Sequence, residues 1–484
     1  MARFTVTTFG CQMNQHDSER LSEVLRAAGY SDADGLDDAT LIVLNTCSVR
    51  DKAEHKLRSE VGRLAMLKEQ RPELVLAVAG CVAQQEGERL LKSMPAVDVI
   101  VGPDNLRELP ELLRDVEHGR RRVSTVFDTE TPHFLAAEPV VGGGKVTAFV
   151  TTMKGCNERC SFCIVPATRG PERYRPSTEI LDEVTRWVEA GVREITLLGQ
   201  TVNSYRDPER RLANPPSTAF DALDAQWKKV RRADGDDSEF PALLRAIAAA
   251  TPKLRRLRYT SPHPRHLTPA LAQAHADLPV LARHVHMPVQ SGSDRVLKRM
   301  IRRYTVDEYV ERVTMLRDAV PGLSLSTDVI VGFPGETRED FEATLALMRR
   351  VGYSGVFAFK YSERPQTPSQ KLDDDVSEDE KSARLAELIE LVDGTRQAHL
   401  AHLVGTFQSV LVEGQGKSGA YTGRTERNEI VHFDASPEQL GEIVDVRIVR
   451  AFKNSLSGEL ERKKLRLPLA FANAPRARRN LPVM

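Results

Sequence analysis

The sequence lacks the features that mark several special classes of protein. In 484 residues with 41% hydrophobic side chains, no window approaches the run of about 20 apolar residues that a membrane span needs. Lys and Arg together number 68, as do Asp and Glu, so the net charge does not indicate a nucleic-acid partner. The first residues, MARFTVTTFG, form a strand pattern without a leader or cleavage site. We therefore expect a cytoplasmic protein of several globular domains with no membrane partner.

Cysteine is scarce as well, and its distribution argues against disulfides. The cysteines form two groups of three, which are Cys11, Cys47 and Cys81, and Cys156, Cys160 and Cys163. An odd number of thiols cannot pair completely within a group, and cytosolic proteins keep thiols reduced. We interpret the two groups as two metal sites. A structural zinc or a closed iron–sulfur cluster takes four protein ligands, so each group lacks one.

The first group of cysteines is spread over three similar segments. RFTVTTFGC, ATLIVLNTC and ELVLAVAGC each lead a short apolar strand into a loop with a cysteine. The separations of 36 and 34 residues between successive cysteines are typical of βαβ units. Because the strands of such units are parallel, Cys11, Cys47 and Cys81 can converge at one edge of the sheet. For any single one of them, a buried structural cysteine is the alternative.

The middle of the chain repeats a strand–helix pattern. A Pro- and Gly-rich stretch at 131–145 precedes it, so we assign 1–120 to an N-terminal domain and 121–144 to a linker. The repeats predict a partial (β/α) barrel over 145–385, with functional groups at the C-terminal ends of the strands. Residues 206–239, rich in Pro, Gly and charge, interrupt the pattern and are expected to be a mobile surface insertion.

The last part of the chain changes to short alternating strands with glycine turns. This pattern over 402–470 predicts a small antiparallel β-barrel. Residues 471–484 read as a disordered basic tail. The expected fold class is α/β, with an open parallel-sheet domain, a partial barrel and a small antiparallel barrel in this order.

The second group of cysteines lies within one loop, with the spacing Cys156-X3-Cys160-X2-Cys163. Soft thiolates on such a loop select an iron–sulfur cluster or zinc. No fourth cysteine or histidine stands nearby to close a zinc site, because His133 precedes the glycines of the linker. The spacing favours a 4Fe–4S cluster with one iron open to an exogenous ligand, as in catalytic sites. Zinc completed by a distant residue is the alternative.

With Phe162 before its last cysteine, this motif resembles the signature of radical S-adenosylmethionine (SAM) enzymes. The chain is similar to the methylthiotransferases over nearly its whole length, through TFGCQMN, NTCSVRDKAEHK and AGCVAQ before the motif, and PVQSGSD, DVIVGFPGET and TGRTERN after it. The resemblance implies a second 4Fe–4S cluster on the first cysteine group, SAM on the open iron of the other cluster, and an RNA-binding barrel of the TRAM type. TGRTERN and CQMN favour the members of this family that modify tRNA.

The resemblance also implies the reaction, which is transfer of a methylthio group to carbon 2 of N6-isopentenyladenosine next to the anticodon of tRNA. SAM would donate the methyl group and also generate the radical, and an electron donor and a sulfur source would be needed. Carbon 2 of adenine is neither acidic nor electrophilic enough for acid–base chemistry, so the cofactor must supply the reactive species. The alternatives are another tRNA adenosine derivative, an aspartate of a ribosomal protein, and a non-catalytic RNA-binding protein. We expect a monomer.

Weaker patterns predict the residues that bind SAM and RNA. Small residues in QSGSD and turn glycines in GFPGE let a ligand approach the backbone, and an arginine in RYRP can pair with the SAM carboxylate. The candidates for SAM binding are Phe162, Arg173, Gln200, Asn203, Gln290, Ser291, Gly292, Gly332 and Pro334. Arg424 and Arg427, in TGRTERN, are the candidates for RNA contact.

The two cysteine groups predict the iron content of the protein. After anaerobic purification and reconstitution, it should hold about eight iron atoms, because each group suits a 4Fe–4S cluster. Iron and sulfide analysis checks this, and a content of about four after careful reconstitution would contradict the second cluster.

Overall fold

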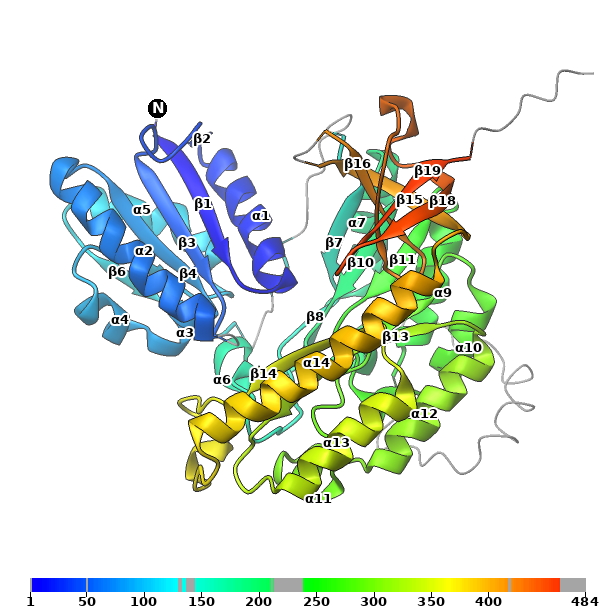
Figure 1. The fold of residues 1–484 in the computed structure, drawn as a ribbon. Coiled ribbons are helices and arrows are strands. Elements are labelled where there is room, and N and C mark those ends of the chain that lie inside the picture. Colours follow the sequence, from blue (N-terminus) through cyan, green and yellow to red (C-terminus); the bar gives the residue numbers. More distant parts are fainter. Residues whose placement is uncertain are drawn as a thin grey trace, which may run out of the picture.

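The computed structural model describes residues 2–48, 51–128, 133–135, 144–209, 212, 238–416 and 419–461. Figure 1 shows an α/β domain in blue, a central barrel in cyan to yellow and a small β-barrel in orange and red. This order confirms the predicted fold class. Among the described residues, no helix has both the length and the apolar character that a membrane crossing requires.

The N-terminal domain is a parallel sheet with helices on both faces. Its strand order is β2-β1-β3-β4-β5-β6, with bounds Ser31–Asp32, Arg3–Phe9, Leu41–Thr46, Val75–Gly80, Val99–Val101 and Arg122–Ser124. The helices are α1 (Gln12–Ala27), α2 (Asp51–Gln70), α3 (Cys81–Glu86), α4 (Glu88–Ser93), η1 (Leu106–Glu108) and α5 (Leu109–Glu117). Alternate residues of β3 enter two separate hydrophobic cores, one on each face, as expected for a parallel sheet.

The sheet ends later in the chain than the sequence indicated. Strand β6 pairs with β5, so the sheet reaches Ser124, inside the segment predicted as linker. A strand of three residues carries too little periodicity to be recognised from the sequence.

The central barrel alternates strands and helices, as the repeated pattern in the sequence predicted. One parallel sheet holds β7 (Thr147–Thr151), β10 (Glu194–Leu198) and β11 (Arg256–Tyr259), and a second holds β12 (His284–His286), β13 (Ser324–Val331) and β14 (Gly355–Lys360). A bridge between Leu257 and Leu281 connects them. The helices are α6 (Val165–Arg169), α7 (Ser177–Glu189), η2 (Val202–Ser204), α9 (Phe240–Ala250), η4 (Pro264–His266), α10 (Pro269–Asp277), α11 (Asp294–Arg299), α12 (Val306–Ala319) and α13 (Arg338–Val351). A short antiparallel pair, β8 (Met153–Lys154) and β9 (Arg173–Tyr174), frames the loop of the second cysteine group.

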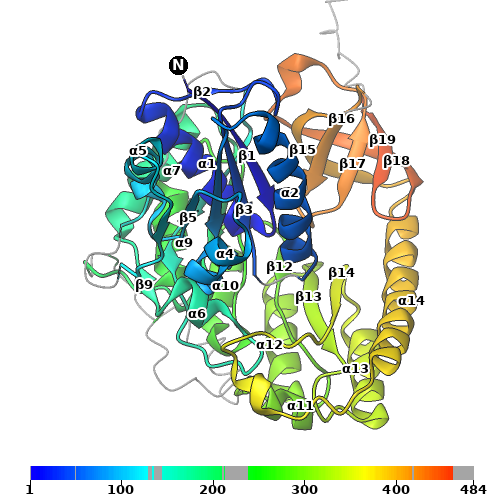
Figure 2. The same ribbon diagram turned by 90° about the vertical axis from the view of Figure 1, so that its left-hand side faces the viewer.

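The chain leaves the central barrel through η5 (Pro368–Lys371) and α14 (Glu378–His402) and enters a closed five-stranded barrel. Figure 2 shows this small barrel at one end of α14 and helix α13 near the other. The barrel elements are β15 (Phe407–Gln415), β16 (Tyr421–Thr425), β17 (Ile430–Phe433), η6 (Pro437–Gln439), β18 (Ile443–Ala451) and β19 (Leu456–Leu460). Closure leaves no exposed sheet edge.

Most of the predicted insertion at 206–239 lies outside the described residues, as does the basic tail at 471–484. The described residues at the two ends of the insertion form hydrogen bonds with neighbouring parts of the barrel. The carboxylate of Asp207 accepts hydrogen bonds from the backbone N–H (3.1 Å) and the hydroxyl (2.7 Å) of Ser177, at the start of α7. The N–H of Glu239 donates to the carbonyl of Tyr205 at 2.8 Å. The two ends therefore meet, and a short connection can join them.

Replacing residues 210–237 by a short Gly/Ser linker should leave the thermal midpoint of the apoprotein nearly unchanged, because the ends are already joined. In the same background, Asp207→Ala should lower the free energy of unfolding by about 1–3 kcal/mol, since it leaves buried donors at the start of α7 without an acceptor. Denaturation followed by circular dichroism measures both. Loss of cooperative unfolding in the linker variant would show that the replaced residues are needed for folding.

Candidate functional site

Cys11, Cys47 and Cys81 converge at the C-terminal edge of the N-terminal sheet. Strand register aligns Phe9 with Thr46 and Thr46 with Gly80, and each strand is followed within two residues by its cysteine. The thiols of Cys11 and Cys47 are hydrogen-bonded, and the charge of Cys11 acts on Cys81. Gly10 has φ of +146°, and a β-carbon there would overlap that of Cys47, so the approach of the two loops requires glycine.

A buried amide network fixes the loops that carry Cys11 and Cys47. The Asn45 amide donates to the carbonyl of Asn14 and to the hydroxyl of Ser18, both at 2.9 Å. The Asn14 amide donates to Asn45 Oδ1 at 3.0 Å, and Asn14 Oδ1 lies 3.2 Å from Cys11 Sγ. Asn14 is the last residue of CQMN, so this asparagine sets the geometry of the site. The sequence motif did not reveal that role.

The thiols of this group differ in acidity. The hydrogen bond from Cys47 lowers the pKa of Cys11 to about 6, helped by backbone N–H groups at the start of α1 and by the charge of Arg169. Burial raises the pKa of Cys81, although Arg169 opposes the shift. Binding a metal centre would fix all three as thiolates.

Cys156, Cys160 and Cys163 lie on the loop after β8, within the mouth of the central barrel. The N–H of Cys163 donates to the carbonyl of Cys160, and the N–H of Cys156 to that of Gly170, both at 3.1 Å. Cys156 Sγ lies 2.9 Å from the hydroxyl of Thr201, after β10. Burial raises the pKa of Cys156 to about 11. Burial and, to a smaller extent, the charge of Cys160 raise the pKa of Cys163 to about 12.

A guanidinium lies against the second cysteine group. Arg302 is buried and donates to Cys160 Sγ at 3.2 Å. Its neighbours Ile301 and Arg303 both have positive φ, 57° and 56°, a costly conformation for residues with a β-carbon. The short loop after α11 is therefore held in the shape that brings this charge to the thiols.

The sulfurs of each cysteine group can be compared with the ligands of a single metal ion. Thiolates on one tetrahedral zinc lie about 3.8 Å apart, given Zn–S bonds of about 2.3 Å. In the part of the chain that the structure describes, only Glu158, His263 and His266 bring three ligand atoms of His, Cys, Asp or Glu within 4.8 Å of one another. In neither cysteine group do all three sulfurs lie that close together. As soft donors, the three thiols of each group suit an iron–sulfur cluster.

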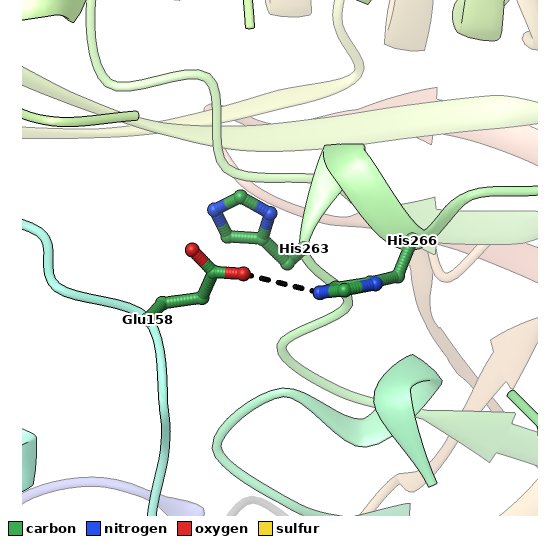
Figure 3. A group of neighbouring side chains, drawn as sticks. All are labelled: Glu158, His263 and His266. Atoms are coloured by element: carbon green, nitrogen blue, oxygen red, sulfur yellow. Dashed lines mark hydrogen bonds and ion pairs between the residues drawn. The ribbon is translucent and has the colours of Figure 1, made fainter. Parts of the chain in front are cut away.

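The group of Glu158, His263 and His266 was not predicted, and it lies directly beside the second cysteine group. Figure 3 shows the carboxylate facing both rings, with His266 Nε2 3.1 Å from one oxygen. Glu158 Oε2 and His263 Nε2 are buried and have no hydrogen-bond partner among the described residues. Arg265 lies 3.8 Å from Glu158. Burial holds the pKa of His263 well below its usual value, and the positive charges of nearby arginines lower it as well. This positive surrounding favours a polar ligand over a divalent cation.

The residues predicted after β10 have different surroundings. Both polar atoms of the Gln200 amide are buried without a partner among the described residues, one position before the Thr201 that contacts Cys156. The Asn203 amide is instead fully used by the backbone of His263, at 3.0 and 2.8 Å. Gln200 thus offers hydrogen bonds to a ligand, whereas Asn203 joins two loops at the barrel mouth.

The segment QSGSD is shaped by helix packing. A β-carbon at Gly292 would lie 2.5 Å from the Cα of Thr344 in α13, and the N–H of Gly292 donates to the Thr344 hydroxyl at 2.9 Å. Ser291 is buried against the same threonine. Gln290 has φ of +75°. The close approach that we predicted for a ligand at Gly292 is made by a helix, and SAM contact by these residues stays a prediction.

Three other candidates hold loops around the second cysteine group. Gly332, with φ of +67°, packs against Lys381 of α14, and the carbonyl of Pro334 accepts from Arg299 at 2.8 Å. Phe162 packs beside Met300 and Phe333 in a small hydrophobic core. Their roles in SAM binding stay predictions.

Arg173 joins the central barrel to the N-terminal domain. It is buried and forms an ion pair with Asp104, from the loop after β5. It also donates to the carbonyls of Asp128 (2.6 Å) and Arg169 (2.7 Å). These contacts use the two terminal nitrogens, while the buried Nε has no hydrogen-bond partner among the described residues. Pairing of Arg173 with the SAM carboxylate stays a prediction.

Arg424 and Arg427 lie where the small barrel meets the central barrel. Arg424 contacts Glu413 and Asn428 at 3.4 and 3.2 Å, and Arg427 donates to Gln408 at 2.8 Å. Their carbonyls accept from Arg256 and Ser324, both at 2.9 Å. The segment TGRTERN therefore connects the two barrels, and RNA contact by its arginines stays a prediction.

Comparisons with known proteins agree with this architecture. Residues 3–102 match the uncharacterized protein family UPF0004, residues 150–348 the radical SAM superfamily and residues 402–460 the TRAM domain. The chain is 59% identical over 505 residues to a tRNA-2-methylthio-N(6)-dimethylallyladenosine synthase of Sorangium cellulosum, covering 100% of this chain and 99% of the relative. It is 47% identical to the protein of that name from Geobacter metallireducens, covering 94% and 97%.

A solved structure with a similar fold is the radical SAM methyltransferase TsrM from Kitasatospora setae. Its TM-score is 0.51 at 15% sequence identity, covering 84% of this chain and 78% of that one. At this identity the likeness concerns the fold alone.

The different acidities of the thiols predict their reactivity in the apoprotein. At pH 7.5, iodoacetamide should alkylate Cys11 at least about tenfold faster than Cys156 or Cys163, because only a thiolate attacks. The rate at Cys11 should level off above pH 7, since its pKa is about 6, while the other two rates should still rise above pH 9. Peptide mass spectrometry under anaerobic conditions measures this, with the unfolded chain as control. Equal rates in the folded protein would contradict the assignment.

Proposed function

The chain belongs to the family of tRNA-2-methylthio-N(6)-dimethylallyladenosine synthases, and we propose that its two cysteine groups hold two 4Fe–4S clusters with separate roles. It is a radical SAM enzyme that transfers a methylthio group to carbon 2 of the modified adenosine in tRNA. The observation that supports the two-cluster proposal is that each group brings three free cysteines together, one group at a single edge of the N-terminal sheet and the other within a single loop.

Cys156, Cys160 and Cys163 would hold the cluster that binds SAM. When bound, this cluster supplies the electron for reductive cleavage of SAM. The residues around it bind and orient: Arg302 offsets the negative charge at Cys160, and Gln200 presents a free buried amide. Such preorganised donors need no rearrangement when a charged ligand enters.

Glu158 and His263 supply further polar groups beside the second cysteine group. Because His263 Nδ1 accepts the N–H of Arg265 at 3.3 Å, we assign the proton of the neutral ring to Nε2. The site thus offers one donor, at His263 Nε2, and one acceptor, at Glu158 Oε2, to the hydroxyl or amino groups of SAM or of the target nucleoside. Unpaired buried groups of this kind discriminate strongly for a ligand that completes them.

Cys11, Cys47 and Cys81 would hold the second cluster, which would carry the transferred sulfur. The family match covers this domain, and the amide network of Asn14 and Asn45 keeps the loops of Cys11 and Cys47 in place. A sulfur source must replenish this site, and an electron donor must serve the other.

The small barrel would bind the anticodon stem-loop. TRAM domains are the RNA-binding part of the resemblance, and the target base must leave its stack to reach the radical site. If Arg424 and Arg427 contact RNA, phosphate would replace their present partners Glu413 and Gln408. The curated relatives are named for tRNA, so an aspartate of a ribosomal protein is not favoured as substrate. Incubation of purified protein with both substrates tests this choice. We propose that the enzyme acts as a monomer in the cytoplasm.

The two cysteine groups should fail in different ways. Cys160→Ala should abolish formation of 5′-deoxyadenosine from SAM, because the radical site loses a ligand. Cys47→Ala should still form 5′-deoxyadenosine but give no methylthio product, because only the sulfur site is lost. Chromatography of both products with anaerobic, reconstituted protein measures this.

Each variant needs a check for folding and for about four remaining iron atoms, since a metal site also stabilises its domain. A Cys47→Ala protein that keeps the other cluster but forms no 5′-deoxyadenosine would contradict the separate roles. Normal SAM cleavage by Cys160→Ala would do the same.

A further inference from the structure

We propose that Arg169 is a positioning residue that links the two cysteine sites. In this role it holds the first site in place against the central barrel and offsets the negative charge of its thiolates. The inference rests on the proposed function only in assigning a cluster to the first site. The contacts of Arg169 described below do not depend on that assignment.

Arg169 comes from the radical SAM part of the chain but reaches into the N-terminal domain. It ends α6, the helix that begins just after Cys163, and α6 lies beside α3 (Figure 1). Its Nε donates to Cys81 Sγ at 3.3 Å and its Nη2 to Asp17 at 2.5 Å. The side chain is 4% exposed, so water screens these contacts little.

The next residue contacts the other site. The carbonyl of Gly170 accepts the N–H of Cys156 at 3.1 Å, and Gly170 has φ of +72°, a conformation in which glycine avoids strain. Two consecutive residues therefore contact one cysteine of each group. A shift of this segment changes both sites together.

The positive charge of Arg169 lies directly against a cysteine of the first site. One nitrogen of its guanidinium, Nε, contacts Cys81 Sγ, and another, Nη2, contacts Asp17. The thiol, the carboxylate and the guanidinium are all buried. A cation that contacts a cluster ligand stabilises the more reduced, more negative state.

An ion pair that only holds the two domains together would make the same contacts as Arg169. The chain offers a matched control for this alternative. Asp104 pairs with Lys154 and Arg173 across the same interface, and the structure gives these pairs no contact with a cysteine. Asp104→Asn weakens docking without removing a charge from a thiolate. Arg169→Gln removes both the ion pair that docks the domains and the positive charge at Cys81. Arg169→Lys keeps the positive charge but cannot contact Cys81 and Asp17 through two nitrogens at once.

The reduction potential of the first cluster separates the two roles. The full chain with Cys156, Cys160 and Cys163 replaced by Ala is reconstituted anaerobically and titrated under electron paramagnetic resonance. Arg169→Gln should make reduction at least tenfold less favourable, a shift of about 59 mV to more negative potential for one electron. Arg169→Lys should shift it less, and Asp104→Asn should leave it unchanged. An unchanged potential in Arg169→Gln, or an equal shift in Asp104→Asn, would overturn the electrostatic role.

Hydrogen exchange of the wild-type apoprotein tests the positioning role without a cluster. Arg169→Gln should speed exchange at α3 and around Asp17 in α1, because both lose their contact with Arg169. Unchanged exchange there would overturn the positioning role. Failure of the parent variant with the Ala replacements to bind any cluster would instead contradict the two-cluster proposal, so the two failures are distinguishable.

Discussion

The structure depends on gathering thiolates in buried places where their charges repel. Burial raises the pKa of a thiol, and a neighbouring thiolate raises it further, as at Cys163. The chain counters this in both groups with a buried guanidinium, Arg302 at Cys160 and Arg169 at Cys81. These cations reduce the cost of holding the ligands ready, and a bound metal centre supplies the remaining stabilisation.

Both guanidiniums come from segments that are distant in sequence from the cysteine they contact. Arg302 follows α11 and Arg169 belongs to a different domain from Cys81. Each site is therefore complete only when the tertiary structure has formed. The cysteine loops themselves are held locally, by the Asn14–Asn45 amides in one case and by the turn from Cys160 to Cys163 in the other.

Features that depend on residues close together in the sequence, or on a regular spacing, could be predicted from the sequence. Equal spacing of strand and cysteine predicted that Cys11, Cys47 and Cys81 meet, and the spacing within one loop predicted the other group. Nothing local distinguishes Arg169 from an exposed arginine, because its partner Asp17 lies 152 residues away. Gly292 shows why small residues are ambiguous. The sequence indicates that another group approaches the backbone closely, but it does not tell whether that group is a ligand or, as the structure shows, helix α13. The sequence likewise indicates that Arg173 can pair with a carboxylate, but it does not tell which one. In the structure its partner is Asp104.

The interface between the first two domains constrains where the substrate can react. Asp104 with Lys154 and Arg173, and Asp17 with Arg169, are ion pairs with little solvent exposure that cross this interface. Separating the domains would leave buried charges without partners, which is strongly destabilising. These ion pairs therefore favour a fixed relation between the two cysteine sites. In the proposed reaction, a base that receives sulfur from one site and loses hydrogen to a radical from the other would be held between them, which requires a nucleotide turned out of its RNA stack.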